Sequence, residues 1–342
     1  MITNKNLNNK KFNQKKFNNP LLFDLILTLL IFAIIFIIIL NPTKYSAGTI
    51  SGLKLFFFSV LPGLFPFMLL TKLITEIGFI FNITQKFDRF SYKVFGTPGV
   101  SLYAYFMSIL SGYPIGAKII SDLYKKGQIN EIEAKKMCLF CTTSGPIFVI
   151  GAVGTAMFKS YKIGLILYFS HILSSTILAI LYNLFLGKTK YCNLSKTIIV
   201  TKKSNIIAEC INQTINSLFV VGAYITIFYL LTEILDSLKF FDILIKTTLP
   251  FFSKLGLSTN QLNGVFYGFL EVTRGAKALS ISQNNLSTVL TSGILSFSGL
   301  SIIMQSMSFL KDAKIKAHTF ICFKCVHMVF SMFLCGILII IF

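Results

Sequence analysis

Two short polar sequences interrupt otherwise apolar parts of this 342-residue chain. The first, Ser-Gly-Tyr-Pro-Ile-Gly-Ala-Lys, covers residues 111–118, and the second, Glu-Val-Thr-Arg-Gly-Ala-Lys, covers residues 271–277. Each combines helix-breaking residues with hydroxyl groups and cations. A helix that begins at such a break presents unpaired N–H groups, which attract a carboxylate or a phosphate. The two sequences therefore predict a binding site for a small anion.

Two further polar breaks divide apolar runs at residues 142–146 and 296–299. Their glycines allow the backbone to approach a ligand closely, and their hydroxyl groups offer it hydrogen bonds. From the four breaks we predict a substrate-binding set that includes no catalytic and no metal-ligating residue. The set consists of Ser111, Gly112, Tyr113, Pro114, Gly116, Lys118, Thr142, Thr143, Ser144, Gly145, Glu271, Thr273, Arg274, Gly275, Lys277, Ser298 and Gly299.

The members of this set also have structural interpretations. Arg274 either holds an anion with its planar fork of donors or forms an ion pair with Glu271, three residues earlier. The hydroxyl groups at the breaks also suit hydrogen bonds between packed membrane helices. Tyr113 suits packing as well as stacking on a planar ligand. The sequence leaves these alternatives open.

A coupling ion would need an acidic or titratable group near the expected membrane segments. The acidic candidates for binding a proton or a sodium ion are Glu76, Glu209 and Glu233. His171 and His327 lie in apolar runs, where we expect packed histidines rather than proton relays. The sequence does not decide between H⁺ and Na⁺, and it implies no bound cofactor.

The composition excludes several classes of protein. The chain is 54% hydrophobic and only 13% charged, and its mean hydropathy of +0.74 is that of a membrane protein. Its net charge of +20 comes from lysine clusters between apolar runs, which argues against nucleic acid as a partner. The sequence contains no serine–histidine–acid set, phosphate-binding loop or metalloprotease spacing, so we expect no enzyme. The expected partners are the lipid bilayer and a small anionic substrate, and a homo-oligomer is left open.

The apolar arms on either side of each polar sequence are too short to cross a bilayer. Residues 100–110 would form a helix of about 16 Å, whereas the hydrocarbon core is about 30 Å thick. Such arms enter the membrane and turn back. Broken backbone at that depth must be buried in protein or line a watery cavity. We therefore predict two re-entrant helical hairpins, over residues 100–125 and 259–283.

The fold class that follows is an all-α polytopic membrane protein. Two of its transmembrane helices are interrupted at the breaks described above. Pro146 cannot donate to the helix ladder and disfavours the helical conformation of the residue before it, and the second break lies at residues 296–299. We predict about seven full spans, although the segment 236–258 leaves their number open by one. The spans cover residues 21–40, 55–81, 137–158, 163–186, 206–235, 286–310 and 319–342.

The two halves of the chain repeat the same order of segments. Gly63 and Gly116 are 53 residues apart, as are Gly222 and Gly275. The segments expected in the cytoplasm carry 20 lysines and arginines and those expected outside carry seven, which places the halves in opposite orientations. The predicted divisions are a disordered basic cytoplasmic tail (1–19), an anchor helix and loop (20–54), a first repeat (55–204) and a second, inverted repeat (205–342).

Three of these sequences together resemble a known family. They are residues 111–118, Cys-Thr-Thr-Ser-Gly-Pro-Ile-Phe-Val-Ile-Gly at 141–151, and Gly-Phe-Leu-Glu-Val-Thr-Arg-Gly at 268–275. The pattern is similar to the YlbJ type of sporulation integral membrane protein, which carries a nucleoside-recognition Gate domain. The likeness covers residues 50–340 and implies a distant relationship with concentrative nucleoside transporters. It also implies transport of dipicolinic acid across the outer forespore membrane.

Three hypotheses about function follow from the residues and the resemblance together. The first is a secondary transporter that moves a small organic anion, above all dipicolinic acid, during endospore formation. The second is a cation-coupled nucleoside symporter, and the third is a membrane component of a sporulation complex that does not transport. All three place a multi-pass protein in the cell membrane, by resemblance the mother-cell-derived outer forespore membrane. The direction of transport is left open.

Overall fold

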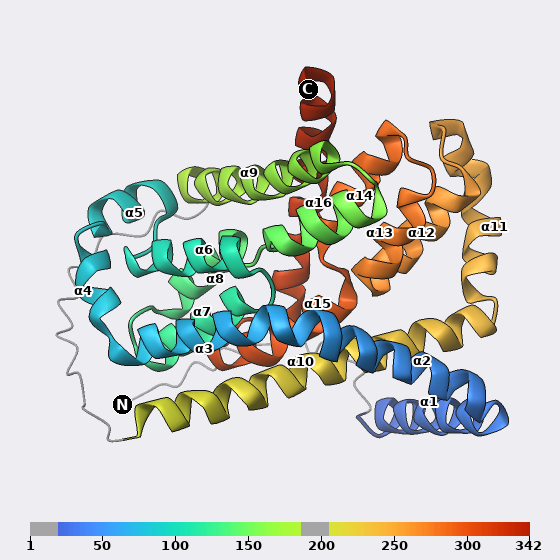
Figure 1. The fold of residues 1–342 in the computed structure, drawn as a ribbon, viewed down its shortest axis with the longest axis horizontal. Coiled ribbons are helices and arrows are strands. Elements are labelled where there is room, and N and C mark those ends of the chain that lie inside the picture. The colour runs from blue at the N-terminus through green and yellow to red at the C-terminus, as the bar shows by residue number, and fades with distance from the viewer. Residues whose placement is uncertain (1–19, 186–204) are drawn as a thin grey trace, which may run out of the picture. The chain divides into compact units, whose positions relative to one another are not determined.

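A computed structural model describes residues 20–185 and 205–342 of the chain (Figure 1). The predicted basic tail 1–19 and the predicted loop 187–204 lie outside the described residues. The chain divides into two compact units, Met1–Tyr45 and Ser46–Phe342. The expected division into two repeats is a different partition and stays a prediction.

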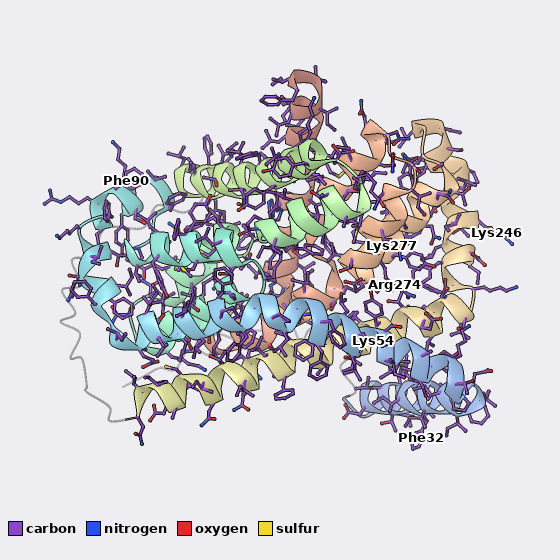
Figure 2. All side chains as sticks on the ribbon, viewed as in Figure 1. Phe32, Lys54, Phe90, Lys246, Arg274 and Lys277 are labelled. Atoms are coloured by element: carbon purple, nitrogen blue, oxygen red, sulfur yellow. The ribbon has the colours of Figure 1, made fainter. Side chains whose placement is uncertain are left out.

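In the first unit, α1 (Pro20–Leu40) is a continuous helix of 21 residues. Its large apolar side chains, such as Phe32 and Phe36, are mostly exposed, as a helix surrounded by lipid requires (Figure 2). The α2 helix (Pro42–Leu55) begins in the first unit and continues into the second. We expected a loop in this region, but Pro42 at the first helical position starts a helix instead.

The second unit begins with a helical segment that tolerates a proline. A π-helical turn, η1 (Phe56–Val60), leads into α3 (Leu61–Ile77), which continues past Pro66. The expected span 55–81 is broken at Gly78. This residue has a φ of 78°, which ends α3, and the chain bends before the next helix. Two short helices follow, α4 (Phe79–Gln85) and α5 (Asp88–Phe95).

The first predicted hairpin is present as α6 (Val100–Ser111) and α7 (Ile115–Lys125), which pack against each other. Next comes α8 (Glu131–Phe140), whose N-terminus is closed by a reciprocal pair of hydrogen bonds between Asn130 and Glu133. Residues 142–145 are not helical, and a π-helical segment, η2 (Ile147–Met157), resumes after Pro146. The long helix α9 (Tyr161–Phe185) completes this half.

The second half starts with the long helix α10 (Ile206–Ser237), followed by α11 (Phe240–Phe252) and the short η3 (Ser253–Leu255). The second predicted hairpin is formed by α12 (Thr259–Leu270) and α13 (Val272–Ser280). The interrupted helix consists of α14 (Asn285–Phe297) and α15 (Gly299–Leu310), which Ser298 separates. The short η4 (Lys311–Ala313) leads to the last helix, α16 (Ala317–Ile341).

Apart from the short helices α4 and α5 and the helices α11 and η3, residues 61–185 and 206–341 each contain a helix, a hairpin, an interrupted helix and a final long helix in this order. We refer to them as the two halves, and their relation as an inverted repeat stays a prediction. Figure 1 shows the first hairpin in teal and the second in orange. The final helix α16 packs against α8 and α9 of the first half and against α14 of the second. The halves thus meet around α16, which brings their broken segments together.

Among the described residues, four helices are long and apolar enough to cross a membrane, and the number rises to seven if each bent pair of helices is one span. This agrees with the expected polytopic fold of about seven spans. The set of spans differs from the expected one, however. The pair formed by α5 and α6 counts toward the seven, whereas η2 is a short apolar helix and α8 is not counted.

Candidate functional site

The tip of the first hairpin packs against the interruption between α8 and η2. Gly112 has a φ of 80°, and a Cβ atom there would lie 2.4 Å from the backbone nitrogen of Gly145. At Gly116 a Cβ atom would lie 1.5 Å from the carbonyl oxygen of Cys141. Only glycine fits this close approach of two backbones. The predicted residues of these two breaks are therefore brought into direct contact.

Two backbone amides at the start of α7 lack a hydrogen-bond partner among the described residues. The N–H of Ile115 donates to the oxygen of Gly112, and the N–H of Lys118 donates to the oxygen of Pro114. Among the described residues, the N–H groups of Gly116 and Ala117 between them have no hydrogen-bond partner. Both residues are buried. These two N–H groups can donate hydrogen bonds to the oxygen atoms of an anion.

The interruption itself is held by side chains. The hydroxyl of Ser108 accepts a hydrogen bond from the N–H of Thr143, at 3.1 Å, and lies 3.0 Å from the hydroxyl of Thr143. The N–H of Ser144 donates to Nε2 of His171, at 2.9 Å. The hydroxyl of Thr142 donates to the oxygen of Cys138. Buried backbone that leaves the helix is thus satisfied by neighbouring helices.

The tip of the second hairpin is organised differently. The carboxylate of Glu271 accepts hydrogen bonds from the N–H groups of Thr273, at 3.0 Å, and Arg274, at 2.8 Å. The glutamate therefore caps α13 and occupies the amides that we expected to be available to a ligand. Gly275 packs so closely on α12 that a Cβ atom would lie 2.3 Å from Cα of Gly268. At this hairpin the amide site is filled by the protein itself.

A buried lysine lies where the two halves meet. Nζ of Lys324, on α16, donates to the hydroxyl oxygen of Tyr113 at 2.7 Å and to the carbonyl oxygen of Thr142 at 2.6 Å. Ser298 donates to the same tyrosine oxygen, at 2.6 Å. The Lys324 side chain is only 2% exposed. Within residues 20–185 and 205–342, no carboxylate forms an ion pair with Lys324.

His171 joins the two interrupted helices. Its Nε2 accepts from the N–H of Ser144, so the proton of the neutral ring lies on Nδ1, which donates to the hydroxyl of Ser296 at 2.8 Å. His327 donates through Nε2 to the carbonyl oxygen of His171, at 3.0 Å. We expected these histidines to be simply packed. Both are fully buried, and His171 also takes part in hydrogen bonds that connect the halves.

We call this assembly the junction, and it comprises Tyr113, Thr142, Ser144, His171, Ser296, Ser298 and Lys324. Four of these seven belong to the predicted binding set. The fold thus brings the polar residues of the first hairpin and of both interruptions together, and it adds three residues that the prediction omitted. Lys324 was recognisable as a lone cation inside the last apolar span.

The other predicted cations lie outside the junction. Arg274 pairs through Nη2 with Oε2 of Glu233, at 2.9 Å, and its guanidinium lies over the rings of Tyr229 and Tyr267. The expected alternative, an ion pair with the side chain of Glu271, is not formed. Nη1 of Arg274 is buried without a partner. Lys118 pairs with Asp122, on the same helix.

Figure 2 labels Arg274 and Lys277, which both belong to α13 of the second hairpin. Lys246, on α11, points away from this hairpin. Lys277 is exposed, and the described residues form no ion pair with it. Among those residues, no group of three or more histidine, cysteine, aspartate or glutamate side chains could hold a metal ion.

Comparison with known proteins gives one relationship. The chain is 25% identical over 304 residues to the sporulation integral membrane protein YlbJ of Bacillus subtilis (strain 168), a match that covers 83% of this chain and 74% of the relative. No family model and no solved structure matches. This similarity supports a relationship between the chain and the YlbJ-type sporulation integral membrane proteins.

Proposed function

We propose that this protein is a secondary transporter that moves a small organic anion across the membrane of a sporulating cell. A membrane role in sporulation is supported by the similarity to YlbJ. The observation that carries the proposed transport is Lys324, a buried cation with two neutral hydrogen-bond acceptors and no carboxylate partner among the described residues.

An unpaired ammonium group inside a membrane protein is costly, because burial removes water and no opposite charge replaces it. The penalty is several kcal/mol per buried ion. A carboxylate of a bound substrate would supply the missing charge. The protein thus gains the most from binding an anion, whereas a neutral ligand such as a nucleoside leaves Lys324 uncompensated.

The open amides of Gly116 and Ala117 support the same class of substrate. They lie at the N-terminus of α7, where the helix dipole favours negative charge. Tyr113 links these amides to Lys324. It lies at the tip of the same hairpin, and its hydroxyl accepts a hydrogen bond from Lys324. A dicarboxylate could therefore place one carboxylate at Lys324 and the other at the amides of Gly116 and Ala117.

Dipicolinic acid, a flat aromatic dianion, fits this chemistry and is the substrate that the family resemblance implies. Tyr113, Thr142, Ser144 and Ser298 are all buried or nearly so, so the substrate enters when the first hairpin and the second interruption move apart. In inverted-repeat carriers interrupted helices form the binding site, and access alternates largely because one repeat or bundle moves against the other around that site. The outer forespore membrane is the proposed location.

The proposal is tested with purified protein in lipid vesicles, loaded with labelled dipicolinate or labelled uridine, with and without Na⁺ and H⁺ gradients. We expect movement of dipicolinate and not of uridine, and a loss of at least about tenfold in the variant Lys324→Met. Lys246→Met, which changes an exposed lysine, is the matched control.

Uptake of uridine that survives Lys324→Met would instead indicate a nucleoside symporter. Vesicles that move neither compound, from a protein that is folded and inserted, would indicate a membrane component without transport activity. Dependence on a Na⁺ or an H⁺ gradient identifies the coupling ion.

A further inference from the structure

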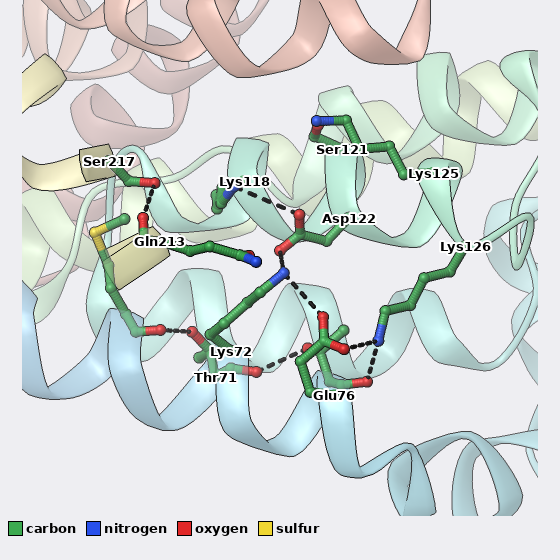
Figure 3. Close-up of polar contacts among 12 residues, drawn as sticks. Thr71, Lys72, Glu76, Lys118, Ser121, Asp122, Lys125, Lys126, Gln213 and Ser217 are labelled. Carbon is green, nitrogen blue, oxygen red and sulfur yellow. Dashed lines mark hydrogen bonds and ion pairs between the residues drawn. The ribbon is translucent and has the colours of Figure 1, made fainter. Parts of the chain in front are cut away.

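A second polar site lies away from the junction, where α3, α7 and α10 pack together (Figure 3). It is a small cavity of about 10 Å³, which is room for a single water-sized species. The residues that line it with polar groups are Thr71, Lys72, Thr75, Lys118, Asp122, Gln213, Thr214 and Ser217. None of the hydrogen bonds of the junction involves them.

Charged side chains around this cavity form a connected network. Nζ of Lys72 lies 3.1 Å from Asp122 and 3.0 Å from Glu76. Lys126 pairs with the other oxygen of Glu76, at 3.1 Å, and Lys118 pairs with Asp122 at 3.5 Å. Three ammonium groups are thus balanced by two carboxylates. As the ion pairs of the described residues form it, the network carries one positive charge in excess.

The excess charge is largely shielded from water. The side chains of Lys72 and Asp122 are 9% and 8% exposed, and that of Lys118 is 20% exposed. The carboxylate of Asp122 is already shared between two lysines. Lys118 has the longest ion pair of the network and otherwise lies over the ring of Phe309, at 5.5 Å. An ammonium has three N–H donors, so Lys118 has capacity for another ligand.

A hydroxyl that lines the same cavity gives independent support for a ligand there. The hydroxyl of Thr214, on α10, is buried and has no hydrogen-bond partner among the described residues. The whole residue is only 3% exposed. Figure 3 shows the side chain of Gln213 extending toward the space between Lys72 and Lys118. A buried hydroxyl without a partner is rare and indicates a ligand or a bound water.

We propose that this cavity binds one small monovalent anion of the halide type, and chloride is the physiological candidate. The anion compensates the excess charge of the lysines and accepts a hydrogen bond from Thr214. An organic anion such as the proposed transport substrate is too large for the cavity. The site therefore differs from the junction in ligand and in location, and its test does not depend on transport.

The anion would connect three helices, α3 through Lys72, α7 through Lys118 and α10 through Thr214. Because α7 is the second arm of the first hairpin, the bound ion ties this hairpin to the two long helices beside it. Halide binding is therefore expected to stabilise the folded protein.

Thermal unfolding of the purified protein measures this stabilisation, in sodium chloride, sodium bromide or sodium gluconate at equal ionic strength. The chain has no tryptophan but has buried free cysteines, so a thiol-reactive dye reports unfolding. We expect the midpoint to be roughly 2–4 °C higher in the halides than in gluconate. Equilibrium dialysis with labelled chloride should give about one ion per chain, because the cavity holds one small species.

Two variants remove ligands of the proposed ion, Lys118→Met and Thr214→Val. Both should lose the halide effect, and chloride affinity should fall by roughly tenfold or more. Lys125→Met is the matched control, because Lys125 lies on the same helix but pairs with Asp312 outside the cavity. The nearly isosteric Thr214→Val keeps the test decisive if Lys118→Met does not fold.

Equal midpoints in halide and gluconate, or absence of bound chloride, would overturn the proposal and leave a water molecule in the cavity. A halide effect that is the same in Thr214→Val, Lys118→Met and Lys125→Met would also overturn it, because the ion would then bind elsewhere.

Discussion

The hydroxyl of Ser298 donates a 2.6 Å hydrogen bond to the hydroxyl of Tyr113, although 185 positions separate the two residues in the chain. Ser298 interrupts the second broken helix, and Tyr113 forms the tip of the first hairpin. This bond therefore joins the breaks of the two halves. Lys324 donates to the same tyrosine oxygen, so Tyr113 orients the buried cation as well.

Replacing Tyr113 by phenylalanine should destabilise the protein by about 1–3 kcal/mol, because Ser298 and Lys324 both lose an acceptor in a buried place. Thermal unfolding gives this loss. In the double variant with Ser298→Ala, the two losses should not add, and the difference should be about 0.5 kcal/mol or more. Tyr161→Phe is the control, since Tyr161 is 62% exposed. Additive losses would show that the two hydroxyls act separately.

The bridge made by His171 should be equally sensitive. In His171→Phe the ring volume is kept, but the N–H of Ser144 and the hydroxyl of Ser296 lose their buried partner, so we expect a loss of about 2–5 kcal/mol. The measurement is the thermal unfolding midpoint. The control is His318→Phe, which changes an exposed histidine. Similar midpoints for the two variants would contradict a bridging role of His171.

Gly116→Ala should prevent the first hairpin from packing on the adjacent interruption. The added methyl group would lie 1.5 Å from the carbonyl oxygen of Cys141, a backbone atom that cannot rotate away. We expect a loss of more than about 3 kcal/mol, or failure of the protein to accumulate. Gly151→Ala is the matched control, because a Cβ atom there has no neighbour within 4 Å. Normal accumulation and stability of Gly116→Ala would show that the hairpin is placed differently.

The capping role of Glu271 gives a separate prediction. Glu271→Ala removes the acceptor of two N–H groups at the start of α13 and should cost about 0.5–2 kcal/mol. Glu271→Asp keeps a good capping side chain and should recover part of that loss. Thermal unfolding distinguishes the two variants. Equal destabilisation of both variants would show that a carboxylate at this position is not sufficient, and the length of the Glu271 side chain would then be what matters.

The fold could largely be predicted because its signals are local. Short apolar arms beside the polar sequences predicted two hairpins, and both are present as α6–α7 and α12–α13. The breaks near Pro146 and Ser298 also lie where the sequence places them. The helix α2 was missed, because Gly48 and Gly52 lower helix propensity there and only their neighbours decide the outcome.

The site could be predicted only in part, because its partners come from distant parts of the chain. Ser144 and Ser298 were predicted from their position in a break. Nothing local indicates that His171 would accept from Ser144, or that Arg274 would choose Glu233, 41 residues away, over Glu271. Lys324 had a signal, a single charge in an apolar helix. That signal is found by treating each intramembrane charge as functional.

Ser298 has a φ of 80° and is followed by Gly299 with a φ of 66°, so two successive residues adopt the left-handed conformation. An ordinary L-residue is held there at a conformational cost of about 1–2 kcal/mol, which glycine would not incur. Glycine, however, has no hydroxyl for Tyr113. The left-handed conformation of Ser298 is thus a local conformational cost, and it is offset by the hydrogen bond that this residue, unlike glycine, donates to Tyr113.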